Sequence, residues 1–286
     1  MSGSSPFIDH SGPLLTGYDL LLCDVWGVIH NGVESFPAAC DALSRARAQG
    51  TTVVLITNSP RPKEAVVPQL DGLRVPGDCY DAMVTSGDVT RAAIVERPGQ
   101  SVFHLGPPRD LPVFEGLDAQ LRDADSANYV VCTGLFDDTQ ETPENYRAML
   151  ERMKARGLFM LCANPDVVVE RGHELVYCAG ALADFYQSIG GDVLYAGKPY
   201  APIYQRAQAL GETIRKSGVP LARVLAIGDS VRTDLNGATA FGIDCLFLTA
   251  GIHSGEIGGT GFDLSKLTSF LEGAQMPKAV THRLVW

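Results

Sequence analysis

Residues 18–28, YDLLLCDVWGV, join an apolar run to an aspartate at its end. The run Tyr18–Cys23 predicts a short strand that is buried within a sheet. Asp24 follows it directly. Because open α/β sheets bind ligands beyond the carboxyl ends of their strands, Asp24 is a candidate functional residue. Downstream, Pro37–Gln49 predicts a helix and Thr52–Thr57 predicts the next strand.

The same alternation of apolar runs and helical patterns continues along the chain. Further strands are predicted at SVFHLG (101–106), YVVCTG (129–134), LFMLCA (158–163), VLYAG (193–197), RVLAIGD (223–229) and CLFLTAG (245–251). Further helices are predicted at Thr142–Arg156, Pro202–Lys216 and Asp234–Phe241. This order predicts an α/β protein with a parallel sheet flanked by helices. The glycine-rich stretch 251–261 lacks the strand–glycine–helix context of a dinucleotide site and predicts a mobile loop.

Length and charge limit the possible functions. The chain has 286 residues, which suggests two domains or one large α/β unit with an insertion. Its 23 Lys and Arg residues against 33 Asp and Glu residues give a net charge of −10. Such a chain has no general attraction to nucleic acid or to an anionic membrane. A phosphate ligand would need a local positive charge, for which a divalent cation is the obvious candidate.

The sequence carries no recognisable targeting signal. Residues 1–15 lack the basic start and the apolar core of a signal peptide, and no stretch approaches the roughly 18 apolar residues of a membrane helix. The seven cysteines are widely spread without a C-x-x-C pair, and the histidines show no zinc-like spacing. We therefore expect reduced, buried thiols and a cytoplasmic location. The tail 277–286 is expected to pack either on the core of the protein or on a partner.

Polar side chains follow four predicted strands directly. They are Asp24, then Thr57 with Asn58 and Ser59, then Lys198, and then Asp229 with Ser230 and, five residues after Asp229, Asp234. Each alone fits a turn or a helix cap, but four strand ends that bring carboxylates, a hydroxyl and a lysine together predict a magnesium-assisted phosphoryl site. A Walker P-loop is excluded, because Pro199 follows Lys198 and Asp192 stands where the motif requires glycine.

The residue types indicate how such a site would work. Neighbouring carboxylates would bind Mg²⁺, which offsets their repulsion and the charge of the phosphate. Thr57, its neighbouring backbone N–H groups and Lys198 would donate hydrogen bonds to the phosphoryl oxygens. The carboxylate after the first strand can then attack phosphorus and form an aspartyl-phosphate.

Four motifs together resemble the haloacid dehalogenase superfamily of phosphatases, over about residues 18–255. They are D-x-x-G-V (24–28), a strand that ends in Thr57-Asn58, G-K-P (197–199) and G-D-S-x-x-T-D (228–234). C-A-N-P-D (162–166) and A-G-A-L (179–182) are similar to the large-cap subclass, class IIA, with nitrophenylphosphatase-like and phosphoglycolate-phosphatase-like enzymes. The resemblance implies a Rossmann-like core at 1–84 and 193–286, with an inserted α/β cap of the C2 type at 85–192.

The resemblance also implies a function and its residues. It implies a Mg²⁺-dependent phosphohydrolase for a small phosphorylated metabolite, with a possible homodimer through the cap and no nucleic-acid or membrane partner. Asp24 would be the nucleophile and a metal ligand, together with Asp229, Asp234 and the backbone carbonyl of Trp26. Thr57 would bind the phosphoryl group, and Lys198 would neutralise nucleophile and phosphate. The residues expected near the phosphate or the substrate are Asn58, Ser59, Asn164 and Asp166.

One position departs from the family pattern. The phosphatases carry a second aspartate two residues after the nucleophile, as general acid and base, and this chain has Trp26 there. Loss of such a group typically costs about 10²–10⁴ in rate, so alkyl phosphates should suffer most and acyl or aryl phosphates least. His30 is either a surrogate acid/base or a loop histidine.

The missing aspartate leaves two alternative functions open. The chain could be a weak or inactive protein that binds a phosphorylated ligand, or a hydrolase of carbon–halogen or carbon–phosphorus bonds. The intact G-D-x-x-x-x-D arrangement (228–234) favours retained Mg²⁺ chemistry over a metal-free dehalogenase.

Overall fold

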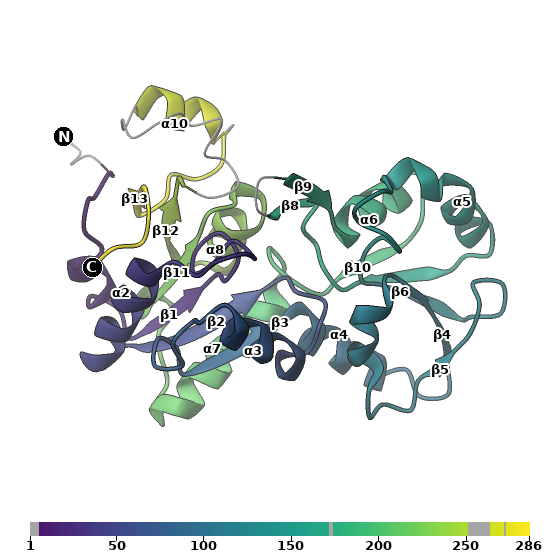
Figure 1. Cartoon of the computed structure of the whole chain (residues 1–286), viewed down its shortest axis with the longest axis horizontal. Coiled ribbons are helices and arrows are strands. Elements are labelled where there is room, and N and C mark those ends of the chain that lie inside the picture. Colours follow the sequence, from purple (N-terminus) through teal and green to yellow (C-terminus); the bar gives the residue numbers. More distant parts are fainter. Residues whose placement is uncertain (1–5, 172–173, 251–263, 272) are drawn as a thin grey trace. The chain divides into compact units, whose positions relative to one another are not determined.

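The computed structural model describes residues 6–171, 174–250, 264–271 and 273–286 (Figure 1). The chain divides into two compact units. The first unit comprises Met1–Thr57, Gln69–Val84 and Tyr204–Trp286, and the second comprises Asn58–Pro68 and Thr85–Ile203.

A six-stranded sheet forms the centre of the first unit, in the order β13-β12-β11-β1-β2-β3. Its strands are β1 (Leu20–Cys23), β2 (Thr52–Thr57), β3 (Ala82–Thr85), β11 (Val224–Gly228), β12 (Asp244–Leu248) and β13 (Ala279–Thr281). β1 lies between β11 and β2 and pairs with both in parallel, and all three strands are buried along their length. Burial on both faces explains why each reads as an unbroken apolar run.

Helices connect these strands. They are α1 (Gly12–Leu15), α2 (Pro37–Ala48), α3 (Lys63–Gly72), α7 (Ala201–Arg215), α8 (Asn236–Phe241) and α10 (Leu264–Phe270), with the 3₁₀ turn η3 (Leu221–Arg223) and the π-helical turn η4 (Val231–Leu235). α2 shows the general pattern: Pro37 occupies its first turn, where a missing N–H costs no hydrogen bond, and its alanine- and leucine-rich face is buried.

The second unit contains a five-stranded parallel sheet, in the order β10-β7-β6-β4-β5. Its strands are β4 (Ser101–Leu105), β5 (Gln120–Leu121), β6 (Tyr129–Cys132), β7 (Phe159–Cys162) and β10 (Val193–Tyr195), and an antiparallel hairpin adds β8 (Val168–Arg171) and β9 (Glu174–Tyr177). Its helical segments are α4 (Ser86–Val95), η1 (Pro108–Phe114), η2 (Pro143–Tyr146), α5 (Arg147–Ala155) and α6 (Ala179–Ser188).

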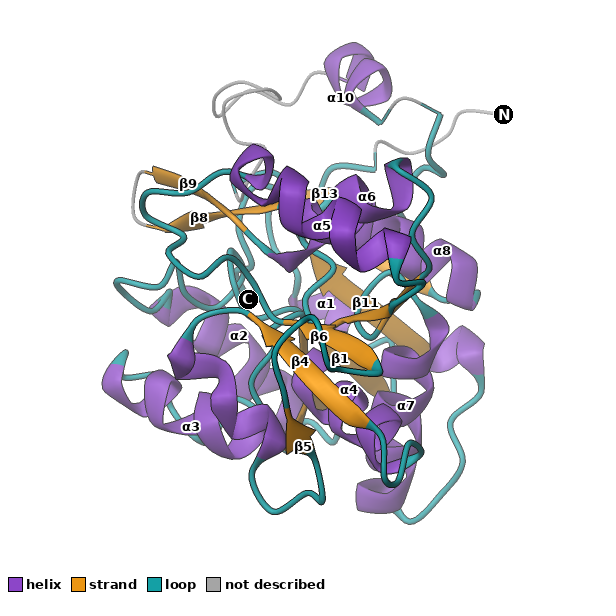
Figure 2. Ribbon diagram, turned by 90° about the vertical axis from the view of Figure 1, so that its right-hand side faces the viewer, coloured by secondary structure: helices purple, strands orange, loops and turns teal. Residues whose placement is uncertain are grey.

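Figure 2 shows the ribbon of this second sheet and its helices. An apolar cluster of side chains covers each of the two faces of the sheet. Val130 and Met160 face α5 and α6, whereas Val131 and Leu161 face α4 and η1. This alternation between adjacent residues follows from the period of two along a strand. Each unit is therefore a parallel sheet flanked by helices, and the predicted α/β fold class is confirmed.

The limits of some predicted elements differ. The segment predicted as one helix, Thr142–Arg156, contains η2 and then α5, because the Thr142 capping box closes a 3₁₀ turn first. The helix predicted at Asp234–Phe241 is the π-helical turn η4 followed by α8. The predicted loop 251–261 lies outside the described residues. Within the described ranges, no helix has the length and apolar character needed to span a membrane.

The tail of the chain packs on the first unit. β13 pairs in parallel with β12, and the Ser11 N–H donates to the Val285 carbonyl at 2.7 Å. The Trp286 ring lies so close to Gly12 that a Cβ at Gly12 would be 2.9 Å from its Cε2 atom. Of the two expectations for the tail, the structure shows packing on the core.

Candidate active site

Three buried carboxylates meet at the carboxyl edge of the first sheet. Asp24 follows β1, and Asp229 follows β11, its neighbour in the sheet. One oxygen from each of Asp24, Asp229 and Asp234 lies within 4.8 Å of the others. The three residues are only 7%, 5% and 2% exposed. Within the described parts of the chain, this is the one group of three or more His, Cys, Asp or Glu side chains close enough to share a metal ion.

The π-helical turn η4 brings Asp234 back to the end of β11. The Asp234 N–H donates to the Ser230 carbonyl at 3.0 Å, and the Ser230 N–H donates to Asp234 Oδ2 at 3.1 Å. A Cβ at Gly228 would lie 2.1 Å from Asp234 Cγ, so this approach requires glycine. The extra residue of the π-helical turn thus sets Asp234 beside Asp229.

The loop after Asp24 needs glycine at one position for two reasons. Gly27 has φ +84°, and a Cβ there would lie 2.2 Å from Asp229 Oδ2. Its N–H donates to the His30 carbonyl at 2.8 Å, which closes the loop on itself. The backbone at Gly27 therefore lies directly against one of the carboxylates. Gly27 and Gly228 both belong to motifs that were recognised in the sequence, but no role was predicted for either glycine.

The chemistry of these donors fits a hard divalent cation. Three buried carboxylates at this separation repel one another, and oxygen ligands are what Mg²⁺ and Ca²⁺ prefer. Asp24, Asp229 and Asp234 would hold such an ion. The predicted contribution of the Trp26 carbonyl stays a prediction.

The Trp26 side chain packs on its own loop. Its ring lies edge-on to His30, with 5.0 Å between ring centroids and 73° between ring planes. A Cβ at Gly32 would lie 2.4 Å from Trp26 Cη2. The ring therefore occupies the space that a side chain at residue 32 would need.

His30 is a packed, uncharged residue at neutral pH. It is 2% exposed, and its Nδ1 accepts a hydrogen bond from the Gly32 N–H at 2.9 Å. Burial lowers the pKa of His30 to about 4. These contacts favour the interpretation of His30 as a loop histidine over the surrogate acid.

Thr57 ends β2 at the same edge as Asp24. β2 pairs in parallel with β1, and the register Cys23↔Leu55 places Asp24 and Thr57 at adjacent strand ends. Thr57 is buried, with 7% of its surface exposed. In the first unit the structure thus brings together four of the predicted site residues, Asp24, Thr57, Asp229 and Asp234.

The remaining predicted residues lie in the second unit, and four of them form one hydrogen-bonded group. Asn58 Oδ1 accepts from the Lys198 N–H at 2.7 Å, while Asn58 Nδ2 donates to the Lys198 carbonyl at 3.1 Å and to Asp166 Oδ1 at 2.9 Å. The Asp166 N–H donates to Asn164 Oδ1 at 3.0 Å. Lys198 is 2% exposed. The carbonyl of Ser59, which follows Asn58, accepts a hydrogen bond from the Gly87 N–H at 3.0 Å.

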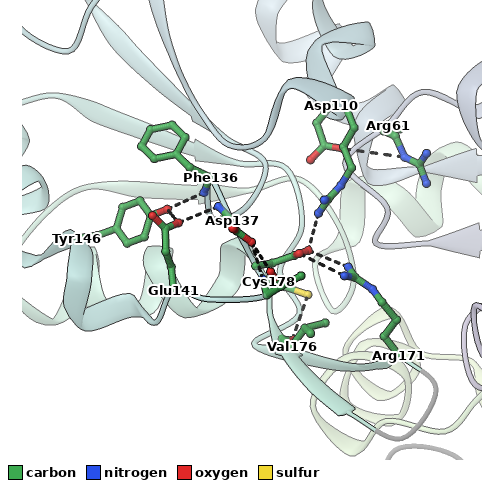
Figure 3. Close-up of polar contacts among 12 residues, drawn as sticks. Arg61, Asp110, Phe136, Asp137, Glu141, Tyr146, Arg171, Val176 and Cys178 are labelled. Carbon is green, nitrogen blue, oxygen red and sulfur yellow. Dashed lines mark hydrogen bonds and ion pairs between the residues drawn. The ribbon is translucent and has the colours of Figure 1, made fainter.

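A further polar cluster in the second unit was not found from the sequence (Figure 3). Its carboxylates are Asp110, which is buried, and Asp138, which is partly buried, and its cations are Arg61, Arg109 and Arg171. Burial raises the pKa of Asp110 to about 6. Burial also acts to raise the pKa of Asp138, but the two guanidinium groups bonded to it, those of Arg171 and Arg109, hold it below the usual value.

Comparison with known proteins identifies relatives of this chain. The sequence model described as haloacid dehalogenase-like hydrolase matches residues 21–120, and the one described as HAD-hydrolase-like matches residues 195–261. A crystal structure of a haloacid dehalogenase-like hydrolase from Brucella suis 1330 is 47% identical, with a TM-score of 0.88, and covers 98% of this chain and 100% of its own.

More distant relatives have named activities. The 5'-nucleotidase YutF of Bacillus subtilis is 23% identical over 247 residues, 84% of this chain and 90% of its own. The 4-nitrophenylphosphatase of Thermotoga maritima is 23% identical, with a TM-score of 0.70, and the match covers 94% and 96% of the two chains.

The parallel-sheet fold, the buried carboxylates at its edge and the matching relatives identify a hydrolytic enzyme. The chain belongs to the haloacid dehalogenase-like hydrolase family.

Proposed function

We propose that this chain is a Mg²⁺-dependent phosphohydrolase that cleaves small phosphate monoesters through an aspartyl-phosphate on Asp24. The observation that carries the proposal is the group of three buried carboxylates whose oxygens lie within 4.8 Å of one another. When bound, Mg²⁺ supplies positive charge that offsets these carboxylates and the incoming phosphate. The activities named for the relatives from B. subtilis and T. maritima support a phosphoryl substrate.

The two parts of the chain would divide the work. Residues 1–84 and 193–286 would form the catalytic core, and residues 85–192 the cap that selects the substrate. Asn58 and Ser59 would line the phosphate pocket, and Asn164 and Asp166 would lie near the substrate.

The chemistry follows from the residues. An Asp24 carboxylate oxygen attacks phosphorus, and the bond to the leaving-group oxygen breaks with its electron pair. The Thr57 hydroxyl and the Lys198 ammonium hold the phosphoryl oxygens. Water then attacks the aspartyl-phosphate, which regenerates Asp24 and releases inorganic phosphate.

Trp26 limits the first step of this scheme. Its side chain gives no proton to the leaving oxygen, and His30 is uncharged at neutral pH. A phenol, with a pKa near 10, or a carboxylic acid, near 4, is released as an anion far more readily than an alcohol. We therefore expect fast turnover of acyl and aryl phosphates and slow turnover of alkyl phosphates.

The test is a panel of acetyl phosphate, p-nitrophenyl phosphate and glycerol phosphate, assayed by phosphate release with Mg²⁺ and with a chelator. Asp24→Asn should reduce every rate to background. The matched control is Asp41→Asn, an exposed aspartate of the same unit whose ion pair with Arg45 lies on the surface of α2. Turnover that survives Asp24→Asn would refute the proposed nucleophile.

A second candidate function has one observation in its favour, the indole at residue 26. A protein that only binds a phosphorylated ligand would show ligand-induced stabilisation and no turnover with any member of the panel. Trp26→Asp and Trp26→Asn separate the two functions. Both substitutions open the same space, but only the carboxyl group of aspartic acid can donate and accept a proton. If the site is otherwise competent, Trp26→Asp raises the glycerol phosphate rate about 10²–10⁴-fold over Trp26→Asn.

A further inference from the structure

The second sheet has a carboxyl edge of its own. All its pairings are parallel, so the carboxyl ends of β4 and β6 lie at one edge, where open α/β sheets bind ligands. Arg109 comes after β4 and Asp138 comes after β6. Arg171, at the end of β8, reaches the same carboxylate.

Asp138 holds two guanidinium groups at once. Arg171 donates through Nη2 to Oδ2 at 2.7 Å and through Nη1 to Oδ1 at 3.2 Å. Arg109 donates through Nη2 to the same Oδ2. The Asp138 side chain is 8% exposed, so both oxygens face the protein and fix the two cations in position.

The arginines themselves reach solvent. The Arg109 and Arg171 side chains are 52% and 39% exposed. Among the described residues, no hydrogen bond uses Nε of either arginine or Nη1 of Arg109. Two cations thus share one carboxylate and still offer N–H donors to an incoming group.

The neighbouring acidic side chains accept hydrogen bonds of their own. Asp137 Oδ1 accepts from the Thr139 N–H and hydroxyl, and Glu141 Oε2 accepts from the Tyr146 hydroxyl and the Asp137 N–H (Figure 3). Asp110 faces Arg61 at 3.9 Å. At their shared contact, Asp138 sets one negative charge against the two positive charges of Arg109 and Arg171.

We propose that Arg109 and Arg171, oriented by Asp138, form a binding site for a small oxyanion, a carboxylate or a phosphate group. Guanidinium groups match the planar geometry of a carboxylate and bind phosphate oxygens in pairs. Because Asp138 fixes both side chains in advance, the site loses little side-chain freedom on binding. The inference does not depend on the proposed phosphohydrolase activity.

The experiment measures binding by calorimetry at low salt, with malonate as the carboxylate probe and inorganic phosphate as the phosphate probe. Arg109→Gln and Arg171→Gln should each weaken binding of the preferred probe about tenfold or more, which is the effect of losing one hydrogen bond to a charged group. The matched control is Arg147→Gln, because Arg147 is 49% exposed and pairs with Glu144 on the surface of the same unit. This control should bind both probes like the wild type.

The outcomes are distinct. A loss with malonate identifies a carboxylate site, and a loss with phosphate identifies a phosphate site. Since phosphate also fits the proposed catalytic site, only the difference between wild type and the arginine variants counts in that arm. Equal binding in all proteins, or no binding of either probe by the wild type, would overturn the proposal whatever the enzyme assays show.

Discussion

A methyl group at residue 27 should abolish the response of the protein to Mg²⁺. Gly27 has φ +84°, and its missing Cβ would lie 2.2 Å from Asp229 Oδ2 and 2.8 Å from Asp229 Cγ. Gly27→Ala must therefore move either the loop or the carboxylate. If the carboxylate moves, Asp229 leaves the position in which it meets Asp24 and Asp234, and if the loop moves, the backbone next to Asp24 shifts away from Asp229.

The chain offers a control that isolates this clash. Gly50 has φ +93°, and nothing lies within 4 Å of the position of its Cβ. Gly50→Ala therefore has only the cost of a left-handed alanine, about 1–2 kcal/mol, which Gly27→Ala shares. The difference between the two variants in their response to Mg²⁺ therefore reports the effect of the clash on the metal site.

The expected size follows from linkage. Mg²⁺ at about 100 times its dissociation constant stabilises the folded state by about 2.7 kcal/mol. At roughly 2–4 °C per kcal/mol, this raises the melting temperature by about 5–11 °C. Gly50→Ala should melt below the wild type and keep this rise, whereas Gly27→Ala should lose most of it. Thermal unfolding followed by circular dichroism, with and without Mg²⁺, measures both. A full Mg²⁺ response in Gly27→Ala would show that the carboxylates do not hold the ion as we infer.

Three further predictions concern stability. The pKa of Asp110 is raised to about 6, so its carboxyl stabilises the fold below about pH 4 and loses that contribution as the pH rises through 6; Asp110→Asn should therefore gain up to about 2–3 kcal/mol over the wild type between pH 4 and 7 in urea titrations. Trp286→Ala removes the ring that packs on Gly12 and should lower the free energy of unfolding by roughly 1–3 kcal/mol; a loss within error would show that the tail is not held there. Gly197→Ala would place a Cβ 2.3 Å from Asn58 Oδ1 and should cost roughly 1–3 kcal/mol by breaking the bonds of Asn58 to residue 198, as denaturation would show.

The sheet and half of the site could be predicted because they depend on local patterns. β1 and β2 are short, wholly buried strands, so their sequences are apolar runs with sharp ends. The residues directly after such runs, Asp24 and Asp229, meet because the ends of neighbouring parallel strands meet.

The rest depends on contacts that leave no periodic trace. Asp234 was predicted at the site, but the π-helical turn that carries it there was not, because the sequence shows no sign of the extra residue. Asp138 pairs with arginines 29 and 33 residues away in the chain, and nothing in either segment specifies the partner. Contacts between two irregular segments could therefore not be predicted from the sequence.

The turn at Gly32 has a consequence for which side chains residue 26 can accommodate. Gly32 has φ +84°, so glycine suits this turn whatever its neighbours are. The same missing side chain leaves the space in which the Trp26 ring lies. An aspartate and a tryptophan at residue 26 therefore both fit this turn without any change at residue 32, whereas any side chain at residue 32 would have to displace the ring.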